Sequence, residues 1–288
     1  MLYKEVFILI INGQLLSQEI RGNILNEVKE LETKYGRVPH LVVILVGDNP
    51  ASQSYVKGKQ KACSEVGFKS TLIKMDADVS EEELLNEIKK INEDKDVDGL
   101  LVQLPLPRHI NEANVINAIS IDKDVDGFHL INVARLHLGE KCIKPCTPKG
   151  IMTMLKSVNI DVKGKHCVVL GRSNIVGRPM AELLLCNDAT VTLCHSKTQN
   201  LKEITRNADI LIVAIGKPKF VTRDYIKEGM CVIDVGVNRV DGHLCGDVDF
   251  DDCKDIASYI TPVPKGVGPM TITSLMENTL ELFKDKFN

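Results

Sequence analysis

The stretch VLGRSNIVGRP, residues 169–179, decides the fold class that this chain is expected to have. It continues an apolar run and leads into MAELL, residues 180–184, so the order is strand, glycine turn and helix. This order is typical of the place where a parallel sheet binds the phosphates of a dinucleotide. The stretch departs from the usual G-x-G-x-x-G fingerprint, because Ser173 stands between Gly171 and Gly177 where a middle glycine is usual. The motif alone therefore leaves an alternative open, a glycine turn with a surface arginine.

Composition limits the classes of protein to consider. The 288 residues suffice for one large domain or two ordinary ones, and 44% hydrophobic with 26% charged residues is typical of a soluble globular chain. The net charge of -3 predicts neither nucleic acid nor an anionic membrane as a partner. The nine scattered cysteines have no framework spacing, which favours reduced thiols in a cytoplasm and no metal site.

Strands and helices are expected to alternate along the chain, which predicts an α/β fold with parallel sheets. The expected strands of the first half are 41–46, 70–75 and 98–103, with helices at 15–34, 52–66 and 81–92 between them. The pattern begins again after Pro148, with a helix at 151–157 and strands at 166–170, 190–194, 209–214 and 230–235. Residues 6–11 are interpreted as an additional first strand.

Two domains follow from this pattern. A parallel-sheet domain is expected over residues 1–147, and a doubly wound, Rossmann-like nucleotide domain over residues 148–269. The last apolar helix, within residues 270–288, is expected to pack back on the first domain.

The strand after the glycine turn tests which dinucleotide would bind. NAD sites usually place an Asp or Glu at the end of this strand, for the ribose 2′-hydroxyl. Here the strand ends in Leu193-Cys194-His195-Ser196-Lys197, without a carboxylate. Arg172 and Ser196 instead provide a guanidinium and a hydroxyl, which suit a 2′-phosphate. The sequence therefore favours NADP over NAD.

The first half carries a second set of candidate residues. Tyr55 and Lys59 are four residues apart, so they share one face of a helix, and such a pair can move protons if the lysine is desolvated. Gln103 ends an apolar strand, where parallel sheets bind their ligands, and Asp126 precedes Gly127. Taken singly, the helix pair is also compatible with an ordinary charged helix, and Asp-Gly with a plain turn.

Taken together, these stretches resemble the bifunctional methylenetetrahydrofolate dehydrogenase/cyclohydrolase family over nearly the whole chain. Seven blocks in the family's order make this resemblance far more specific than any single motif. The blocks are SQSYVKGKQKA (52–62), DGLLVQLPLP (98–107), KDVDGF (123–128), PCTPKG (145–150), GRSNIVGRP (171–179), CHSKT (194–198) and TPVPKGVGPMT (261–271).

The resemblance implies a function in one-carbon metabolism and a role for each matching residue. The enzyme would oxidise 5,10-methylenetetrahydrofolate with NADP and hydrolyse the methenyl product to 10-formyltetrahydrofolate, in a folate-binding cleft between the two domains. Lys59 would be the catalytic lysine, with Tyr55 near the folate, Gln103 tuning Lys59 and Asp126 anchoring the pterin. The substrate side would also include Pro264, Gly266, Val267 and Gly268. The implied cofactor residues are Gly171, Arg172, Ser173, Ser196, Val237 and Thr147. A homodimer in the cytoplasm is also implied.

Two departures from the family pattern stand out. Lys265 occupies a position where many members carry glycine, and the N-terminus, Met1 to Ile11, is longer and more apolar than usual. Three alternatives to the bifunctional enzyme remain. They are a two-domain NADP dehydrogenase for a hydroxy acid, a catalytically inactive binding or regulatory protein, and a dehydrogenase that has lost cyclohydrolase activity.

Overall fold

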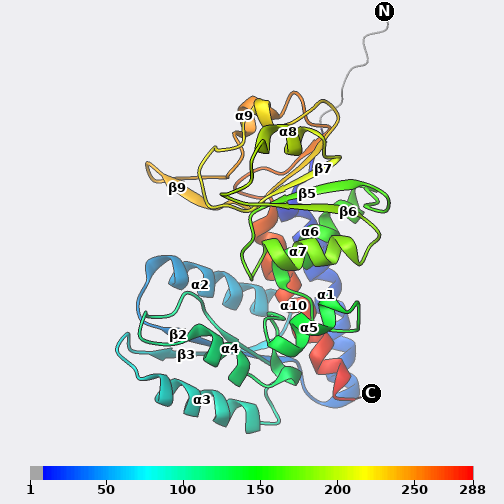
Figure 1. Cartoon of the computed structure of the whole chain (residues 1–288). Helices are drawn as coiled ribbons and strands as arrows, with labels where there is room; N and C mark the ends of the chain where they lie inside the picture. Colours follow the sequence, from blue (N-terminus) through cyan, green and yellow to red (C-terminus); the bar gives the residue numbers. More distant parts are fainter. Residues whose placement is uncertain (1–8, 288) are drawn as a thin grey trace, which may run out of the picture. The chain divides into compact units, whose positions relative to one another are not determined.

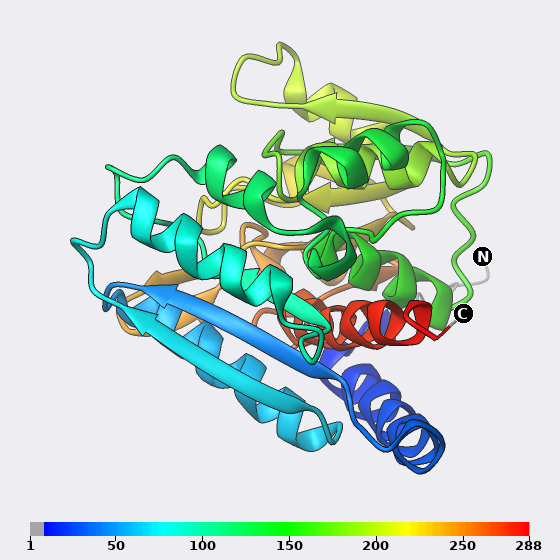
Figure 2. The same ribbon diagram turned by 90° about the horizontal axis from the view of Figure 1, so that it is seen from below.

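Strand β2 (His40–Val46) is the centre of a three-stranded parallel sheet in the order β3-β2-β4. The structure is a computed structural model, and it describes residues 9–287. Strands β3 (Lys69–Met75) and β4 (Gly99–Val102) pair with opposite edges of β2. Figure 2 shows β2 and β3 as blue and cyan arrows running side by side in the same direction. The three strands match the three expected for the first half.

This sheet is buried on both faces, which explains the unbroken apolar run of β2. Leu41, Val43 and Leu45 pack with residues of α2 and of the C-terminal helix. The intervening Val42 and Ile44 pack with α3 on the other face. The helices around this sheet are α1 (Gly13–Tyr35), α2 (Pro50–Glu65), α3 (Glu81–Glu93), α4 (Glu112–Ala118), the 3₁₀ turn η1 (Ile121–Lys123), α5 (Leu130–His137) and α10 (Val267–Asp285).

The second sheet has six parallel strands in the order β1-β11-β8-β7-β5-β6. Their bounds are β1 (Leu9–Ile10), β5 (His166–Leu170), β6 (Thr190–Cys194), β7 (Ile210–Val213), β8 (Cys231–Asp234) and β11 (Tyr259–Ile260). Strand β5 lies between β6 and β7, so the strand order reverses there. Such a switch point is where open parallel sheets bind nucleotides, at the carboxyl ends of the strands.

Helices cover both faces of the second sheet, as in a doubly wound fold. Figure 1 shows α6 (Cys146–Ser157) and α7 (Gly177–Leu185) on one face and α8 (Leu201–Arg206) and α9 (Phe250–Cys253) on the other. A short antiparallel hairpin is formed by β9 (Asn238–Val240) and β10 (His243–Cys245), and a 3₁₀ turn, η2, by Arg223–Tyr225.

The chain forms two compact units, and the division falls between Cys146 and Thr147. Within the described residues, one unit comprises 18–146 and 272–287 and holds the three-stranded sheet, while the other comprises 9–17 and 147–271. The first strand differs from expectation. Residues 6–8 lie outside the described part of the chain, and Leu9–Ile10 pairs with Tyr259–Ile260 of the second sheet. Of the residues that the structure describes, 9–17 therefore belong to the unit with the six-stranded sheet and not to the unit that holds residues 18–146. Within residues 9–287, no helix combines the length and the apolarity that crossing a membrane requires.

Candidate active site

Helix α2 carries Tyr55 and Lys59 on one face, one turn apart. Asn49 fixes the start of the helix, because its Oδ1 atom accepts hydrogen bonds from the backbone N–H groups of Ala51 and Ser52 at 2.9 and 3.2 Å. Tyr55 is 44% exposed, whereas Lys59 is half-buried. The helix thus presents an accessible phenol and a partly desolvated ammonium side by side.

Lys59 contacts Gln103, as the family resemblance implies. The Lys59 Nζ atom donates a hydrogen bond of 3.0 Å to Gln103 Oε1. Gln103 follows β4 directly, and its backbone N–H still donates to Ile44 O at 2.9 Å, which extends the sheet by one residue. Its side-chain Nε2 donates to Leu104 O at 2.7 Å. Because that bond fixes the amide orientation, Oε1 is turned toward the lysine.

Asp126 lies in a turn that a second carboxylate holds in place. Asp124 is buried and accepts hydrogen bonds from the backbone N–H groups of Gly127, Phe128 and His129 at 3.1, 3.3 and 2.9 Å. Gly127 has a φ of 68°, and a Cβ atom there would collide with the carbonyl oxygen of Ile143. Asp-Gly therefore does form a turn, and this turn sets the direction of the Asp126 side chain.

Lys59 and Asp126 perturb each other's pKa in a desolvated environment. Burial lowers the pKa of Lys59 from its usual value, and the nearby Asp126 carboxylate opposes this shift. Burial raises the pKa of Asp126 to about 6, while Lys59 opposes the shift and Asp124 adds to it. Both groups therefore change charge more readily near neutral pH than they would in water, which is typical of acid–base sites.

Two residues of this cluster had no role in the sequence interpretation. The Cys146 thiol donates to Val125 O at 3.4 Å and to Asp126 Oδ1 at 3.6 Å. Asn278 of α10 is fully buried, and its Nδ2 donates to Val125 O at 2.8 Å and to Lys144 O at 2.9 Å. Cys146 lies in the PCTPKG block, so its position was a usable signal. For Asn278 the sequence offered a weaker signal, an amide side chain within an apolar helix, which indicates a buried polar group that needs a partner.

The glycine turn of the second unit has the tight geometry that the sequence predicts. Gly171 has a φ of 124°, and a Cβ atom there would collide with Ala214 O. A Cβ atom on Gly177 would collide with Gly171 O, so both positions require glycine. Ser173 Oγ accepts hydrogen bonds from the backbone N–H groups of Val176 and Gly177 at 3.2 and 3.3 Å. The serine thus closes the turn itself, and these two N–H groups already have a partner.

A cavity of about 300 Å³ lies at the carboxyl ends of β5, β6 and β7. Its lining comprises Leu170, Gly171, Arg172, Ser173, His195, Ser196, Leu201, Ala214, Ile215, Lys217 and Phe220. Four of the expected cofactor residues, 171–173 and 196, therefore meet at one site. None of the described residues that line it carries a carboxylate.

Lys217 adds a second cation to this cavity, beside Arg172. Its Nζ atom lies 5.4 Å from the centroid of the Phe220 ring, over the ring face. Residues 214–217 follow strand β7 directly, so the general rule for the carboxyl ends of parallel strands could have identified them from the sequence. The cavity combines two cations, two hydroxyl groups and an apolar wall, a donor set that fits a dinucleotide with an additional phosphate.

The other expected site residues lie outside the lining of this cavity. Thr147 is the second residue of α6, and its Oγ1 lies 3.0 Å from Thr271 Oγ1. Val237 is 49% exposed and follows β8. On the substrate side, Pro264 and Gly266 precede α10, and Val267 and Gly268 are its first two residues. Within it, Lys265 has a φ of 80°, a backbone conformation in which glycine is favoured and lysine is strained. This explains the physical preference for glycine at that position.

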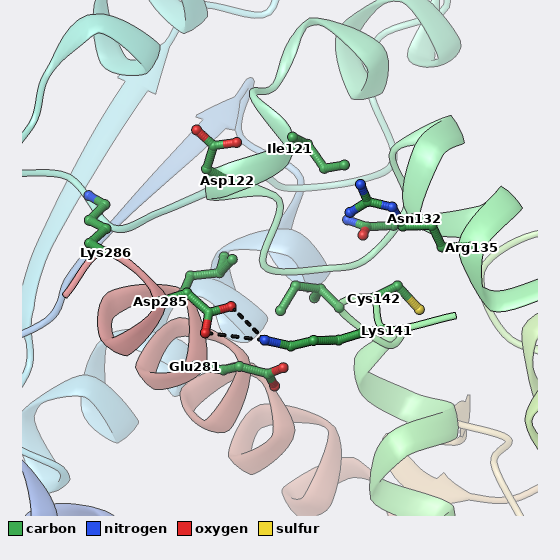
Figure 3. A pocket seen from close by; sticks show the side chains of 11 residues that line it. Ile121, Asp122, Asn132, Arg135, Lys141, Cys142, Glu281, Asp285 and Lys286 are labelled. Atoms are coloured by element: carbon green, nitrogen blue, oxygen red, sulfur yellow. Dashed lines mark hydrogen bonds and ion pairs between the residues drawn. The ribbon is translucent and has the colours of Figure 1, made fainter. Parts of the chain in front are cut away.

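A second cavity, of about 430 Å³, lies in the unit that holds Lys59 but does not include Lys59, Gln103 or Asp126. Figure 3 shows its side chains, with Lys141 reaching toward Asp285 of α10. The Lys141 Nζ atom lies 3.1 Å from Asp285 Oδ2, so opposite charges on its wall already pair with each other. Among the residues that the structure describes, no group of three or more His, Cys, Asp or Glu is arranged to hold a metal ion.

Comparison with known proteins identifies both units. Residues 11–126 match the family model described as the tetrahydrofolate dehydrogenase/cyclohydrolase catalytic domain, and residues 145–287 match the NAD(P)-binding domain of the same family. The bifunctional protein FolD of Anoxybacillus flavithermus is 58% identical over 278 residues, which is 96% of this chain and 98% of that protein.

Solved structures agree with this assignment. The methylenetetrahydrofolate dehydrogenase/cyclohydrolase FolD of Campylobacter jejuni has a TM-score of 0.95 and 49% identity, and the match covers 96% of this chain and 99% of that one. The Trypanosoma brucei enzyme, solved with NADP and an inhibitor, has a TM-score of 0.93 and 40% identity, with 97% and 98% covered.

Proposed function

Because this chain belongs to the tetrahydrofolate dehydrogenase/cyclohydrolase family, we propose that it oxidises 5,10-methylenetetrahydrofolate with NADP and then hydrolyses the methenyl product to 10-formyltetrahydrofolate. The observation that carries this proposal is the hydrogen bond between Lys59 and Gln103, with Asp126 beside the same lysine. The family resemblance makes Lys59 the catalytic lysine of the hydrolytic step, Gln103 the residue that tunes it, and Asp126 the anchor of the pterin.

Lys59 is the group that moves protons in the hydrolytic step. Addition of water to the methenyl carbon and opening of the ring require a proton to leave the water and a proton to reach a ring nitrogen. The lowered pKa of Lys59 makes the loss of its proton easier than for an exposed lysine. Gln103 Oε1 accepts from the ammonium and holds it in one direction. Gln103 therefore acts by orienting Lys59.

Asp126 binds the pterin in this proposal. Its carboxylate is desolvated and has a pKa of about 6, so at pH 7.5 it is mainly ionised and can accept hydrogen bonds from the pterin amide and amine. Tyr55, exposed on the same helix face as Lys59, lies against the folate. We assign Pro264, Gly266, Val267 and Gly268 to the substrate side on the family resemblance.

The cavity at the carboxyl ends of β5, β6 and β7 holds NADP. Arg172 and Ser196 bind the 2′-phosphate, and Lys217 adds a charge of the same sign on the cavity wall. Gly171 and Ser173 form the turn beneath it, and Thr147 and Val237 are assigned to the cofactor by the resemblance. When bound, NADP accepts the hydride from the methylene carbon. That step needs no acid from the protein, because the lone pair of the substrate nitrogen stabilises the cation that forms. The protein contributes by orienting the substrate and the cofactor.

Two further proposals concern the oligomeric state of the protein and its location in the cell. We propose a homodimer, which the family resemblance implies; sedimentation would then give twice the chain mass of 31.9 kDa. A cytoplasmic location is supported by the nine cysteines, all of which are present as thiols.

One assay distinguishes the proposed function from its alternatives. The purified protein is mixed with methylenetetrahydrofolate and NADP, and methenyl absorbance is followed with time. The bifunctional enzyme produces methenyl absorbance that rises and then decays. A dehydrogenase without cyclohydrolase activity produces a stable rise. A hydroxy-acid dehydrogenase or a catalytically inactive binding protein produces no rise.

A further inference from the structure

Asp247 is a buried carboxylate that holds two loops next to the cofactor cavity. Its side chain is 0% exposed. Oδ2 accepts hydrogen bonds from the backbone N–H groups of Ile215 and Gly216 at 2.7 and 2.9 Å, and Oδ1 accepts from the N–H of Lys217 at 2.8 Å. Oδ1 also accepts from Asn238 Nδ2 at 2.9 Å. One side chain therefore binds segment 215–217 and the residue after Val237.

A second buried carboxylate, Asp234, holds Asp247 in place. It ends β8 and is 3% exposed. Its Oδ1 accepts from the backbone N–H groups of Gly236 and Asp247 at 2.9 and 3.0 Å, and its Oδ2 accepts from Val248 N–H at 2.9 Å. Both ends of segment 236–238 are thereby tied to a carboxylate, Gly236 to Asp234 and Asn238 to Asp247.

Two glycines make room for these carboxylates. A Cβ atom on Gly236 would collide with the Asp247 carboxyl group, and a Cβ atom on Gly246 would collide with the Asp234 carboxyl group. Neither glycine has the positive φ that would otherwise explain it. The glycines in DVGVN (234–238) and GDVD (246–249) therefore serve the packing of the two acids.

The place of Asp247 connects it to the cofactor cavity. Ile215 and Lys217 line the cavity, and both donate their backbone N–H groups to Asp247. The same loop continues around the acid, since Val221 N–H donates to Asp247 O at 2.9 Å. Asp247 is fully buried and is absent from the cavity lining, so it is placed to act through the loop backbone and not by touching a ligand.

Burying the Asp247 carboxylate costs desolvation free energy. Its four hydrogen bonds offset this cost only if their donors stay in fixed positions. The charge of Asp247 therefore favours a single arrangement of segment 215–217 and of Asn238. We propose that Asp247 is a positioning residue for NADP, holding Ile215, Lys217 and Val237 in their binding arrangement. This inference rests on the proposed dehydrogenase function.

The test is Asp247→Asn, which keeps the size of the side chain. In the variant, an amide NH₂ group replaces one of the two acceptor oxygens of Asp247. That NH₂ group is a donor and would face N–H groups that are also donors, so the loop loses its fixed arrangement. We expect NADP to bind roughly 10- to 100-fold more weakly, the loss typical of hydrogen bonds to a charged group. The KM for NADP should rise in step, and kcat at saturating NADP should stay within about threefold of wild type. Hydrolysis of supplied methenyltetrahydrofolate needs no cofactor and should stay within about twofold of the wild-type rate.

Asp209→Asn is the matched control, because Asp209 Oδ2 accepts from His166 N–H at 2.9 Å at the opposite, amino end of the same strands. This variant should bind NADP as wild type does. Asn238→Ala removes one donor and should weaken NADP binding about threefold to tenfold.

If Asp247→Asn bound NADP with wild-type affinity, the proposal would be overturned. An equal loss of NADP binding and of hydrolysis would also overturn it, because it would indicate a general role of Asp247 in folding. If Asp247→Asn does not fold, Asn238→Ala decides in the same way: weaker NADP binding with intact hydrolysis supports positioning, and unchanged binding overturns it. A wild-type protein that neither binds NADP nor hydrolyses the methenyl compound would refute the proposed function itself, a result distinct from both.

Discussion

The ammonium group of Lys59 on α2 donates a hydrogen bond of 3.0 Å to the amide oxygen of Gln103, the residue that follows β4. Two elements of one unit thus place an acid–base group and the residue that orients it in direct contact. The neighbouring Asp126 completes the group. The proposed cyclohydrolase chemistry depends on this contact.

Replacing Lys59 by Met keeps the apolar stem and removes the charge and the proton. Loss of a positioned acid–base group typically lowers a rate by about 10²- to 10⁴-fold, and we expect this loss for hydrolysis of methenyltetrahydrofolate. Part of the dehydrogenase activity should remain, because hydride transfer needs no proton from the protein. Stopped-flow measurement of both steps checks this. Hydrolysis at the wild-type rate by Lys59→Met would show that another group moves the proton.

Gln103→Glu places a carboxylate where an amide now accepts the hydrogen bond of Lys59. An opposite charge at this distance favours the ammonium form and raises the pKa of Lys59 relative to wild type. If the neutral amine is needed, the rise of the hydrolysis rate with pH should shift to higher pH in this variant. Gln103→Ala is the control, because it removes the bond without adding a charge. A pH profile that shifts to lower pH in Gln103→Glu would contradict the role of the neutral amine.

Asp126→Asn should affect folate binding and stability in opposite directions. The folded protein holds the pKa of Asp126 at about 6, above the ordinary value of 3.8, so the ionised carboxylate disfavours folding at neutral pH. Stability from this group is fully present below pH 3.8 and is lost as the pH rises through 6. The variant should therefore unfold at a higher temperature than wild type at pH 7.5, with a smaller difference at pH 5.

Folate affinity is the second measurement on Asp126→Asn. Calorimetric titration should show much weaker folate binding and nearly unchanged NADP binding, because a charged acceptor for the pterin is lost. Asp251→Asn is a suitable control, since that carboxylate is exposed and pairs with Lys254 at the surface. An equal loss of both ligands would mean that Asp126 supports the fold instead of the pterin.

Arg172→Ala tests the choice of cofactor. If the guanidinium binds the 2′-phosphate, its removal should weaken NADP binding by roughly 10- to 150-fold and leave the use of NAD nearly unchanged. The ratio of kcat/KM for the two cofactors, measured in wild type and variant, gives the answer. An unchanged ratio would show that Arg172 does not bind the 2′-phosphate. A wild-type preference for NAD would show that NADP is not the cofactor.

Local patterns predicted most of the elements, and the family resemblance implied the contact between Lys59 and Gln103. The apolar run 41–46 is typical of a buried parallel strand, and Gln103 stands at the end of a strand, where parallel sheets bind ligands. Asp247 was not predicted, because its partners at 215–217 are about 30 residues away and donate through the backbone, which has no side-chain signal. The pairing of Leu9 with Tyr259 was not predicted either, because the two residues lie near opposite ends of the chain and local sequence patterns do not show which strands pair.

The central claim is that one chain performs both steps with two separate sets of residues. The most direct test compares wild type, Lys59→Met and Arg172→Ala in the same two assays, oxidation of the methylene compound at limiting NADP and hydrolysis of supplied methenyl compound. We expect Lys59→Met to accumulate the methenyl compound, and Arg172→Ala to form it slowly and to hydrolyse supplied material at the wild-type rate. Parallel loss of both activities in both variants would contradict it.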